Sequence, residues 1–131
     1  MELHLKIIGL LLIVLAITHI VFPKYFGWKE DLKNITLINK QMMYVHTFFI
    51  GVTVFLMGVF CLFNSSDIIN TKLGKNLSLG MFVFWTLRLY FQFFIYSTKL
   101  WKGKKLETII HVVFSILWIY LCLAFMFIYL F

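Results

Sequence analysis

Four apolar segments, each long enough to cross a membrane as a helix, take up most of this chain and leave little room for another fold. They run over residues 3–22, 41–63, 77–98 and 106–131, and a hydrocarbon core needs about 20 apolar helical residues. Hydrophobic residues make up 63% of the chain, and its mean hydropathy is +0.97. Soluble domains are only about 45 to 50% apolar. The sequence therefore predicts an integral membrane protein.

The apolar segments predict an all-α fold. Lipid-exposed backbone must satisfy its own hydrogen bonds, and apolar runs without strand alternation do so as helices. We expect four transmembrane helices in an antiparallel up-down-up-down bundle that forms one domain over residues 1–131. Pro23 is expected to end the first helix, because proline interrupts helical hydrogen bonding.

Two connections between the spans have different predicted structures. Residues 24–40 carry Leu32, Ile35 and Ile38 at helical spacing among polar side chains. This pattern favours an interfacial amphipathic helix that runs into the second span. Residues 64–76 are mostly polar and are expected to form a turn region without evident chemistry.

The positive charge of the chain, a formal net charge of +7, lies mainly in two of the connecting loops. An excess of lysine marks the loops that stay in the cytoplasm, so we expect both termini outside the cytoplasm, in a bacterial inner (plasma) membrane. The lysines then set topology and contact anionic membrane lipid, and nucleic acid is not an expected partner. Eight lysines lie on the predicted inner side and three on the outer side: Lys24, Lys29, Lys33, Lys40, Lys99, Lys102, Lys104 and Lys105 against Lys6, Lys72 and Lys75.

Three histidines, His19, His46 and His111, lie inside the apolar segments near the predicted inner face. At a helical rise of about 1.5 Å per residue, each lies roughly 5 to 9 Å inside the boundary. The third span has no histidine, but Gln92 falls at the same depth. Helical bundles build metal sites from such layers of side chains. Glu107, one turn before His111, is expected to bind the metal or to accept a hydrogen bond from His111.

The layer predicts a transition metal ion, zinc or iron, with an open coordination position. Three protein ligands with a free fourth position are typical of catalytic zinc. Such a site could activate water against a lipid-like or other small-molecule substrate, which would make the protein a metal-dependent enzyme with catalytic residues not yet assigned. An oligomer is compatible with these features.

Haem b is an alternative ligand for the same histidines. Two of them could be axial ligands, with Gly51 and Gly58 leaving room for the macrocycle and Arg88 meeting a propionate. The protein would then serve electron transfer or sensing. A third reading gives the histidines structural roles only.

Arg88 falls near the middle of the third span, where insertion costs about 2.5 to 3.5 kcal/mol. Arg88, Gln92 and Tyr96 follow one another at a spacing of four residues and therefore share a helix face. We expect Arg88 and Tyr96 to bind a cofactor or an anionic ligand. The alternative is a transporter or channel subunit with a polar pathway along this span.

Two pairs of soft ligands lie toward the opposite face, Met57 with Cys61 and Cys122 with Met126. Thiolate and thioether together suit Cu(I). They are also ordinary core side chains, and both cysteines are expected to be free thiols.

Overall fold

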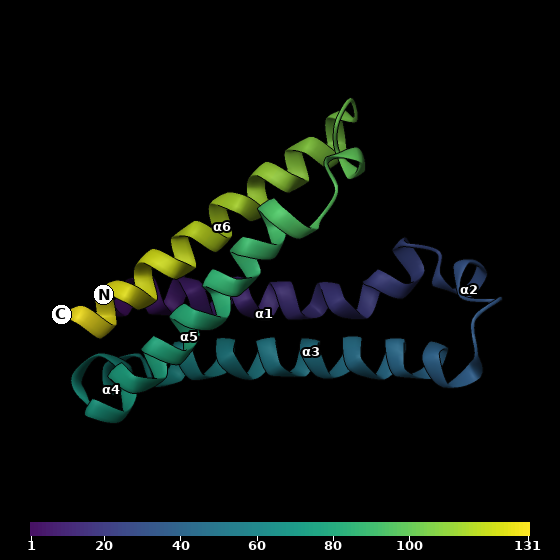
Figure 1. Ribbon diagram of the computed structural model, residues 1–131. Coiled ribbons are helices and arrows are strands. Elements are labelled where there is room, and N and C mark those ends of the chain that lie inside the picture. The colour runs from purple at the N-terminus through teal and green to yellow at the C-terminus, as the bar shows by residue number, and fades with distance from the viewer. The chain divides into compact units, whose positions relative to one another are not determined.

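The computed structural model describes all 131 residues, and every regular element in it is helical (Figure 1). Four helices are long and apolar enough to span a membrane: α1 (Glu2–Tyr25), α3 (Leu37–Phe63), Lys72–Ile95 and α6 (Lys105–Leu130). The third of these consists of α5 (Lys72–Tyr90) and the π-helix η1 (Phe91–Ile95). Short helices lie in the connections: α2 (Trp28–Asp31), α4 (Ser65–Asn70) and the 3-10 helix η2 (Thr98–Leu100).

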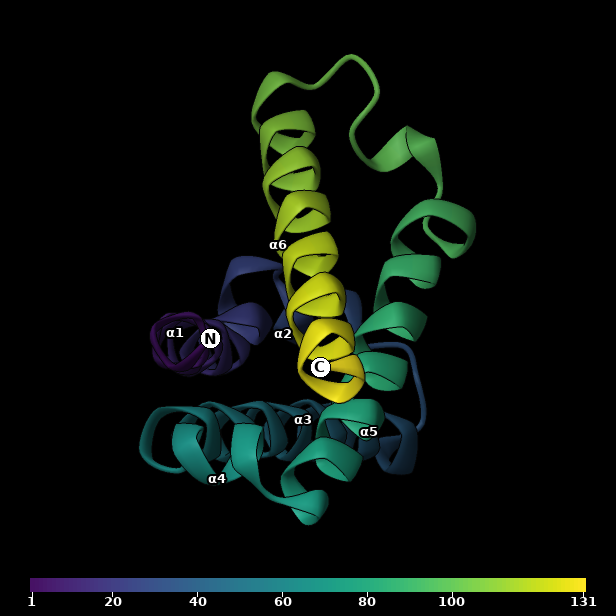
Figure 2. The same ribbon diagram turned by 90° about the vertical axis from the view of Figure 1, so that its left-hand side faces the viewer.

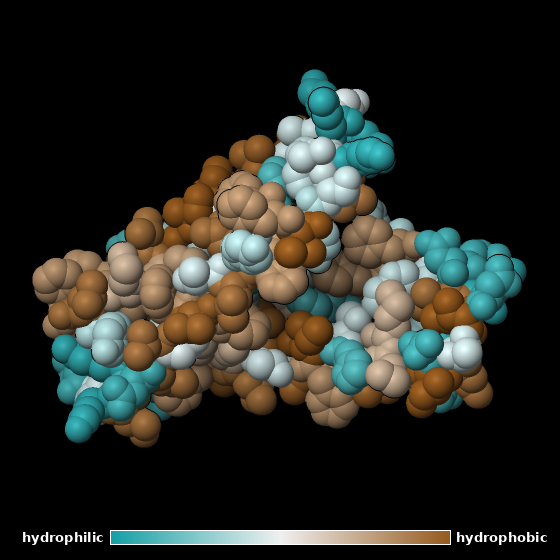
Figure 3. All heavy atoms as spheres, viewed as in Figure 1, coloured by the Kyte–Doolittle hydropathy of each residue, from teal (hydrophilic) through white to brown (hydrophobic).

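The surfaces of the long helices are apolar, as an integral membrane protein requires. Only 22 to 39% of the residues in each span are buried within the structure, so most apolar side chains are left for contact with lipid or with other helices. Figure 3 shows hydrophobic residues along the helices and hydrophilic residues gathered at the connecting loops. The four spans therefore indicate an integral membrane protein.

The chain divides into two compact units, each an antiparallel pair of helices (Figures 1 and 2). The first hairpin covers residues 2–65 and packs α1 against α3. The second hairpin covers residues 66–131 and packs α5 against α6; Met1 groups with it.

Backbone contact at Gly9 and Gly58 closes the first hairpin. A Cβ atom on Gly9 would lie 2.7 Å from the carbonyl oxygen of Gly58, and one on Gly58 would lie 2.8 Å from the carbonyl oxygen of Gly9. Further along the interface, a Cβ atom on Gly51 would lie 3.5 Å from the carbonyl oxygen of Ala16. Small residues at membrane helix interfaces allow such close approach, which replaces the hydrophobic driving force that lipid removes.

The first helix does not end at Pro23, contrary to the prediction from sequence. It continues to Tyr25, and the chain turns only at Gly27, which has a φ of 65°. Proline lacks the N–H that would bond the carbonyl of His19, and its ring crowds that carbonyl, but the residues after proline can stay helical. The helix therefore bends toward its end instead of stopping (Figure 1).

The predicted amphipathic helix after the first span is only a short turn. α2 has four residues, and Thr36, with φ −58° and ψ 149°, separates it from α3. Leu32 is buried, but Ile35 and Ile38 are exposed, so the three do not form one face. Asn34, Ile35 and Thr36 are all weak helix formers, which explains the break.

Residues 64–76 form helices rather than the expected turn region. α4 occupies Ser65–Asn70, and α5 begins at Lys72 instead of residue 77. The hydroxyl of Thr71 accepts a hydrogen bond from the N–H of Gly74 at 2.9 Å and donates one to the carbonyl of Asp67 at 2.8 Å. Gly74 packs directly on the backbone of α4. Hydropathy did not predict the first turn of α5, because this turn is polar.

Candidate functional site

A chain of hydrogen bonds links three polar side chains in the second hairpin. Nη1 of Arg88 donates to Oε1 of Gln92 at 3.2 Å, and Nε2 of Gln92 lies 2.8 Å from Nδ1 of His111. Gln92 is only 7% exposed, so its amide depends on these partners. The structure thus brings together Arg88, Gln92 and His111, which sequence analysis had selected from α5, η1 and α6.

Arg88 sets the direction of this chain. A guanidinium only donates hydrogen bonds, so it requires the carbonyl oxygen of Gln92, and the amide nitrogen must then face His111. The amide nitrogen also only donates, so Nδ1 of His111 is the acceptor. The neutral His111 ring therefore carries its hydrogen on Nε2.

The π-helix η1 positions Gln92 and ends the span early. The N–H of Tyr96 bonds the carbonyl of Phe91 at 3.1 Å, five residues back, and Tyr96 itself is extended. The third span thus ends at Ile95 rather than at residue 98. The Tyr96 ring lies against Arg88, with its centroid 5.4 Å from the guanidinium carbon. Single π turns inside α-helices occur frequently at functional sites.

Aromatic rings surround the charge of Arg88. Its guanidinium carbon lies 5.0 Å from the centroid of the Trp118 ring, and Trp118 stacks on Trp85 with a centroid distance of 5.1 Å and an interplanar angle of 12°. No carboxylate forms an ion pair with Arg88 in the structure. One amide carbonyl and two aromatic faces therefore provide its compensation within this hairpin.

The same cluster contains buried hydrogen-bond donors without acceptors. The indole N–H groups of Trp85 and Trp118 have no partner, although both residues are only 2% exposed. A buried donor that lacks a partner costs about 1 to 3 kcal/mol. Together with the unused N–H groups of Arg88, these indoles make the cluster rich in donors and poor in acceptors. Nothing in the sequence predicts this imbalance.

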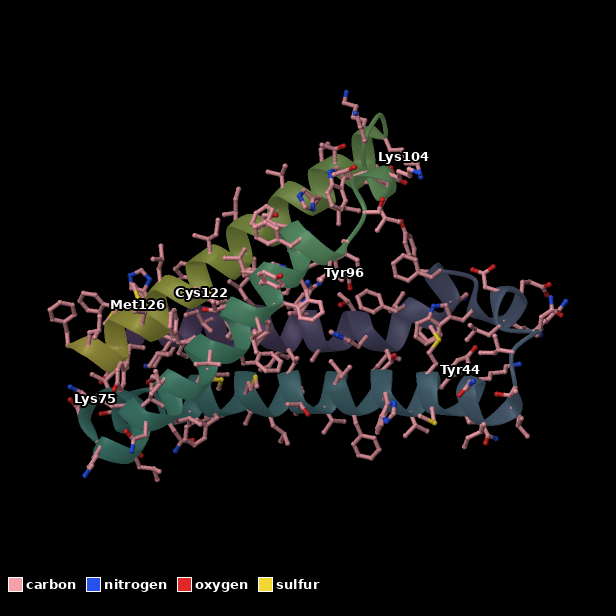
Figure 4. All side chains as sticks on the ribbon, in the orientation of Figure 1. Tyr44, Lys75, Tyr96, Lys104, Cys122 and Met126 are labelled. Atoms are coloured by element: carbon pink, nitrogen blue, oxygen red, sulfur yellow. The ribbon has the colours of Figure 1, made fainter.

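A loop residue, Trp101, covers His111. The two rings stack at a centroid distance of 3.8 Å and an interplanar angle of 12°. The hydroxyl oxygen of Thr108 lies 2.7 Å from the carbonyl oxygens of both Trp101 and Lys104, so it shares its hydrogen between them and ties this loop to the start of α6. Tyr96 and Lys104 mark the two ends of this connection in Figure 4. Glu107 is exposed and forms no hydrogen bond, so it does not support His111 in this structure.

The two histidines of the first hairpin lie in different settings. His19 is partly buried, and its Nδ1 lies 2.9 Å from the carbonyl oxygen of Leu15. His46 is exposed and has no hydrogen-bond partner. The buried residues of α3, Gly51, Val54, Gly58 and Cys61, form a stripe with alternating spacings of three and four, and His46 lies off this stripe. His19 and His46 therefore do not meet at the α1–α3 interface.

The predicted metal ligands are divided between the hairpins. His19 and His46 belong to the first, and Gln92, Glu107 and His111 belong to the second. In neither hairpin do three or more His, Cys, Asp or Glu side chains gather to hold a metal ion. Histidines that bind metals usually donate a hydrogen bond from the other ring nitrogen, whereas Nδ1 of His111 accepts one. The zinc or iron site and the haem b site stay predictions.

The predicted soft ligands are likewise divided. Cys61 lies in the first hairpin and Cys122 in the second, and both are buried free thiols. Cys122 accepts a hydrogen bond from the hydroxyl of Thr86 at 3.6 Å. Figure 4 labels Cys122 and Met126 along α6.

The fold and this cluster define the class of protein: a small polytopic membrane protein made of two helical hairpins, with a donor-rich polar cluster inside the second. No protein-family model matches the chain, and comparison with curated proteins and with solved structures gives no match either.

Proposed function

We propose that this protein binds an anionic amphiphile, a membrane lipid or a lipid-like molecule, with its acidic headgroup at Arg88. The observation that carries this proposal is the half-buried guanidinium of Arg88, which has no acidic partner and adjoins indoles whose N–H groups lack acceptors. A charged side chain in a membrane span is costly and usually serves a ligand or a pathway. Phosphate or carboxylate oxygens would supply the missing acceptors.

The position of Arg88 explains why the ligand should be amphiphilic. Arg88 lies in a membrane-spanning helix, seven residues before its end at Ile95, so a headgroup that reaches it enters the apolar layer. An acyl chain on the ligand would make this entry easier, because the chain stays in contact with apolar lipid and apolar helix surface while the headgroup moves to Arg88. Two features of the flanking α5–α6 connection would help: the aromatic rings of Tyr96 and Trp101 border the cluster, and its lysines would attract anionic headgroups to the membrane surface.

The proposed topology agrees with this role. In an up-down-up-down bundle with both termini outside the cytoplasm, the α5–α6 connection and its four lysines face the inner leaflet of a bacterial plasma membrane. Anionic lipids give that leaflet its negative surface potential. The site would thus open toward the membrane side on which its ligand is abundant.

Binding of phosphatidylglycerol and of phosphatidylcholine to the full chain, measured by native mass spectrometry from mixed detergent micelles, tests the proposal. The wild type should retain phosphatidylglycerol preferentially. Arg88→Gln removes the charge and shortens the side chain, and it should weaken this preference about ten- to hundredfold, since hydrogen bonds to charged groups contribute about 1.5 to 3 kcal/mol. Lys104→Gln removes one of the four lysines of the adjacent connection. Because the remaining three still attract headgroups and an exposed charge is screened by solvent, it should change the preference little.

Two results would overturn the proposal: equal losses in Arg88→Gln and Lys104→Gln, which indicate unspecific attraction, or no preference in the wild type. The same purified sample separates the proposal from the other predictions. A Soret absorption band would identify haem, and a colourless protein with stoichiometric zinc or iron would identify the metal site.

A further inference from the structure

The first hairpin contains a cavity of about 450 Å³ between α1 and α3, separate from the Arg88 cluster. Its lining includes His19 and Pro23 from α1 and Tyr44, Thr47 and Gly51 from α3, and no charged side chain takes part. Figure 4 labels Tyr44 on α3. Ligand pockets in proteins measure about 300 to 1,000 Å³ and combine apolar walls with a few polar groups. The cavity has the size and the lining of a site for a neutral, apolar ligand.

The ring of His19, which lines this cavity, has one nitrogen without a hydrogen-bond partner. Its Nδ1 lies 2.9 Å from the carbonyl oxygen of Leu15, and a carbonyl only accepts, so Nδ1 carries the hydrogen. The neutral ring then has its lone pair on Nε2, and the structure shows no partner there. Gly51 leaves room for this side chain, because a Cβ atom at that position would lie 3.1 Å from Cβ of His19.

Besides the ring of His19, the lining residues carry three polar groups: the hydroxyls of Thr47 and Tyr44 and the backbone carbonyl of His19. Thr47 lines the cavity, and its hydroxyl forms no hydrogen bond in the structure, although hydroxyls in helices usually bond a carbonyl one turn back. Pro23 has no N–H for the carbonyl of His19, which therefore lacks its usual helical partner. His19 and Thr47, which both line the cavity, thus have acceptors and a hydroxyl without partners in the structure.

We infer that this cavity binds a lipophilic molecule with a hydroxyl group, such as an alkylated phenol or ring alcohol. The ligand O–H donates to Nε2 of His19, and its oxygen accepts from the hydroxyl of Thr47. Both residues lie within membrane spans, so the ligand reaches them through the lipid. The absence of charge from the lining distinguishes this ligand from the anionic one at Arg88.

A matched pair of ligands tests this inference on the full chain in lipid nanodiscs. 4-Octylphenol and octylbenzene differ only in the hydroxyl group. Solid-state or solution NMR of ¹⁵N-histidine would follow Nε2 of His19, whose resonance should move upfield as 4-octylphenol binds, because the lone pair then accepts a hydrogen bond. Octylbenzene should leave the resonance unchanged. Each of the two hydrogen bonds should contribute about fivefold to the advantage in affinity of the phenol.

Variants assign the effect to the cavity. His19→Phe keeps the ring but removes the acceptor, and Thr47→Val keeps the volume but removes the hydroxyl; each should reduce the phenol advantage. His46→Phe replaces an exposed histidine off the α1–α3 interface and should retain it. Equal affinities for the two ligands in the wild type would overturn the inference. So would an equal loss in His46→Phe, or zinc or haem bound at Nε2 of His19.

Discussion

Gln92 donates a hydrogen bond to Nδ1 of His111 at 2.8 Å and joins two membrane helices that are 19 residues apart in sequence at this point. The bond has a fixed direction because Arg88 occupies the carbonyl oxygen of the same amide. A reversed amide would set donor against donor at Arg88. The guanidinium therefore determines, through one intervening side chain, which nitrogen of His111 carries hydrogen.

The two partly buried histidines are expected to be opposite tautomers. Nδ1 of His111 should carry no hydrogen because it accepts one from Gln92, whereas Nδ1 of His19 should carry hydrogen because it donates to the carbonyl of Leu15. ¹⁵N chemical shifts of the neutral rings distinguish these forms directly. Arg88→Leu should allow His111 to populate both tautomers and should leave His19 unchanged. Identical tautomers in the wild type would contradict the directed chain.

Arg88→Leu is expected to improve membrane insertion of the third span while it removes the anion site. Arginine costs about 2.5 to 3.5 kcal/mol at the centre of a span on insertion scales and less toward the ends, whereas leucine is favourable by about 0.5 kcal/mol. Arg88 lies seven residues before the end of its span, so it should carry part of this cost. A glycosylation-mapping assay on residues 72–95 would measure the change. Lys75→Leu, near the start of the same span, should have a much smaller effect. Comparable gains from both substitutions would show that Arg88 is not at the costly depth.

Gln92→Leu is expected to destabilise the second hairpin by about 1 to 3 kcal/mol. The substitution keeps the volume of the side chain but leaves a donor on Arg88 and an acceptor on His111 without partners. Unfolding of the full chain in mixed micelles, followed by far-UV circular dichroism, would measure the loss. Phe94→Leu provides the control, because Phe94 lies in the same π-helix and is 72% exposed. A smaller loss in Gln92→Leu than in the control would contradict the role of the amide.

Gly58→Ala should destabilise the first hairpin, whereas Gly80→Ala should not. A methyl group at position 58 would lie 2.8 Å from the carbonyl oxygen of Gly9 and 2.9 Å from the side chain of Ile13, so the helices must separate. Overpacking of this kind costs about 1 to 3 kcal/mol. Gly80 has no atom within 4 Å of the added methyl group, and alanine favours a helix over glycine by about 1 kcal/mol. The same unfolding measurement should give a lower free energy of unfolding than the wild type for Gly58→Ala and no decrease for Gly80→Ala.

Hydropathy alone predicts the four spans, because each apolar run is long and lacks strand alternation. Hydropathy misplaces the ends of the spans wherever a helix begins or ends at a different residue from the apolar segment. Lys72 begins α5 with a polar turn that Thr71 caps, and Pro23 lies inside α1 because a proline disturbs only the turn before it. The tertiary arrangement of spans is beyond what hydropathy can predict.

Residue spacing predicts part of the candidate site. Arg88 and Gln92 are in contact, as their shared helix face implies, and the common depth of Gln92 and His111 matches their hydrogen bond. Tyr96 also lies against Arg88, but it does so as an extended residue beyond the helix end and not through a shared helix face. Depth gives the height of His46 but not its direction around the helix axis. The seven-residue spacing of Gly51 and Gly58 marks the packed face of α3 and could have shown that His46 lies elsewhere. Trp101 belongs to a loop, where no periodicity indicates its stacking on His111.

The stacked indoles of Trp85 and Trp118 give this protein an intrinsic optical reporter. Two parallel rings with a centroid distance of 5.1 Å couple their electronic transitions, and the cation of Arg88 over Trp118 perturbs them further. A change in the charge at Arg88 should therefore alter near-ultraviolet circular dichroism and indole emission without any added label. The other two tryptophans, Trp28 and Trp101, lie in connecting segments rather than in spans. Spectroscopy on unmodified chains could thus observe occupancy of this site.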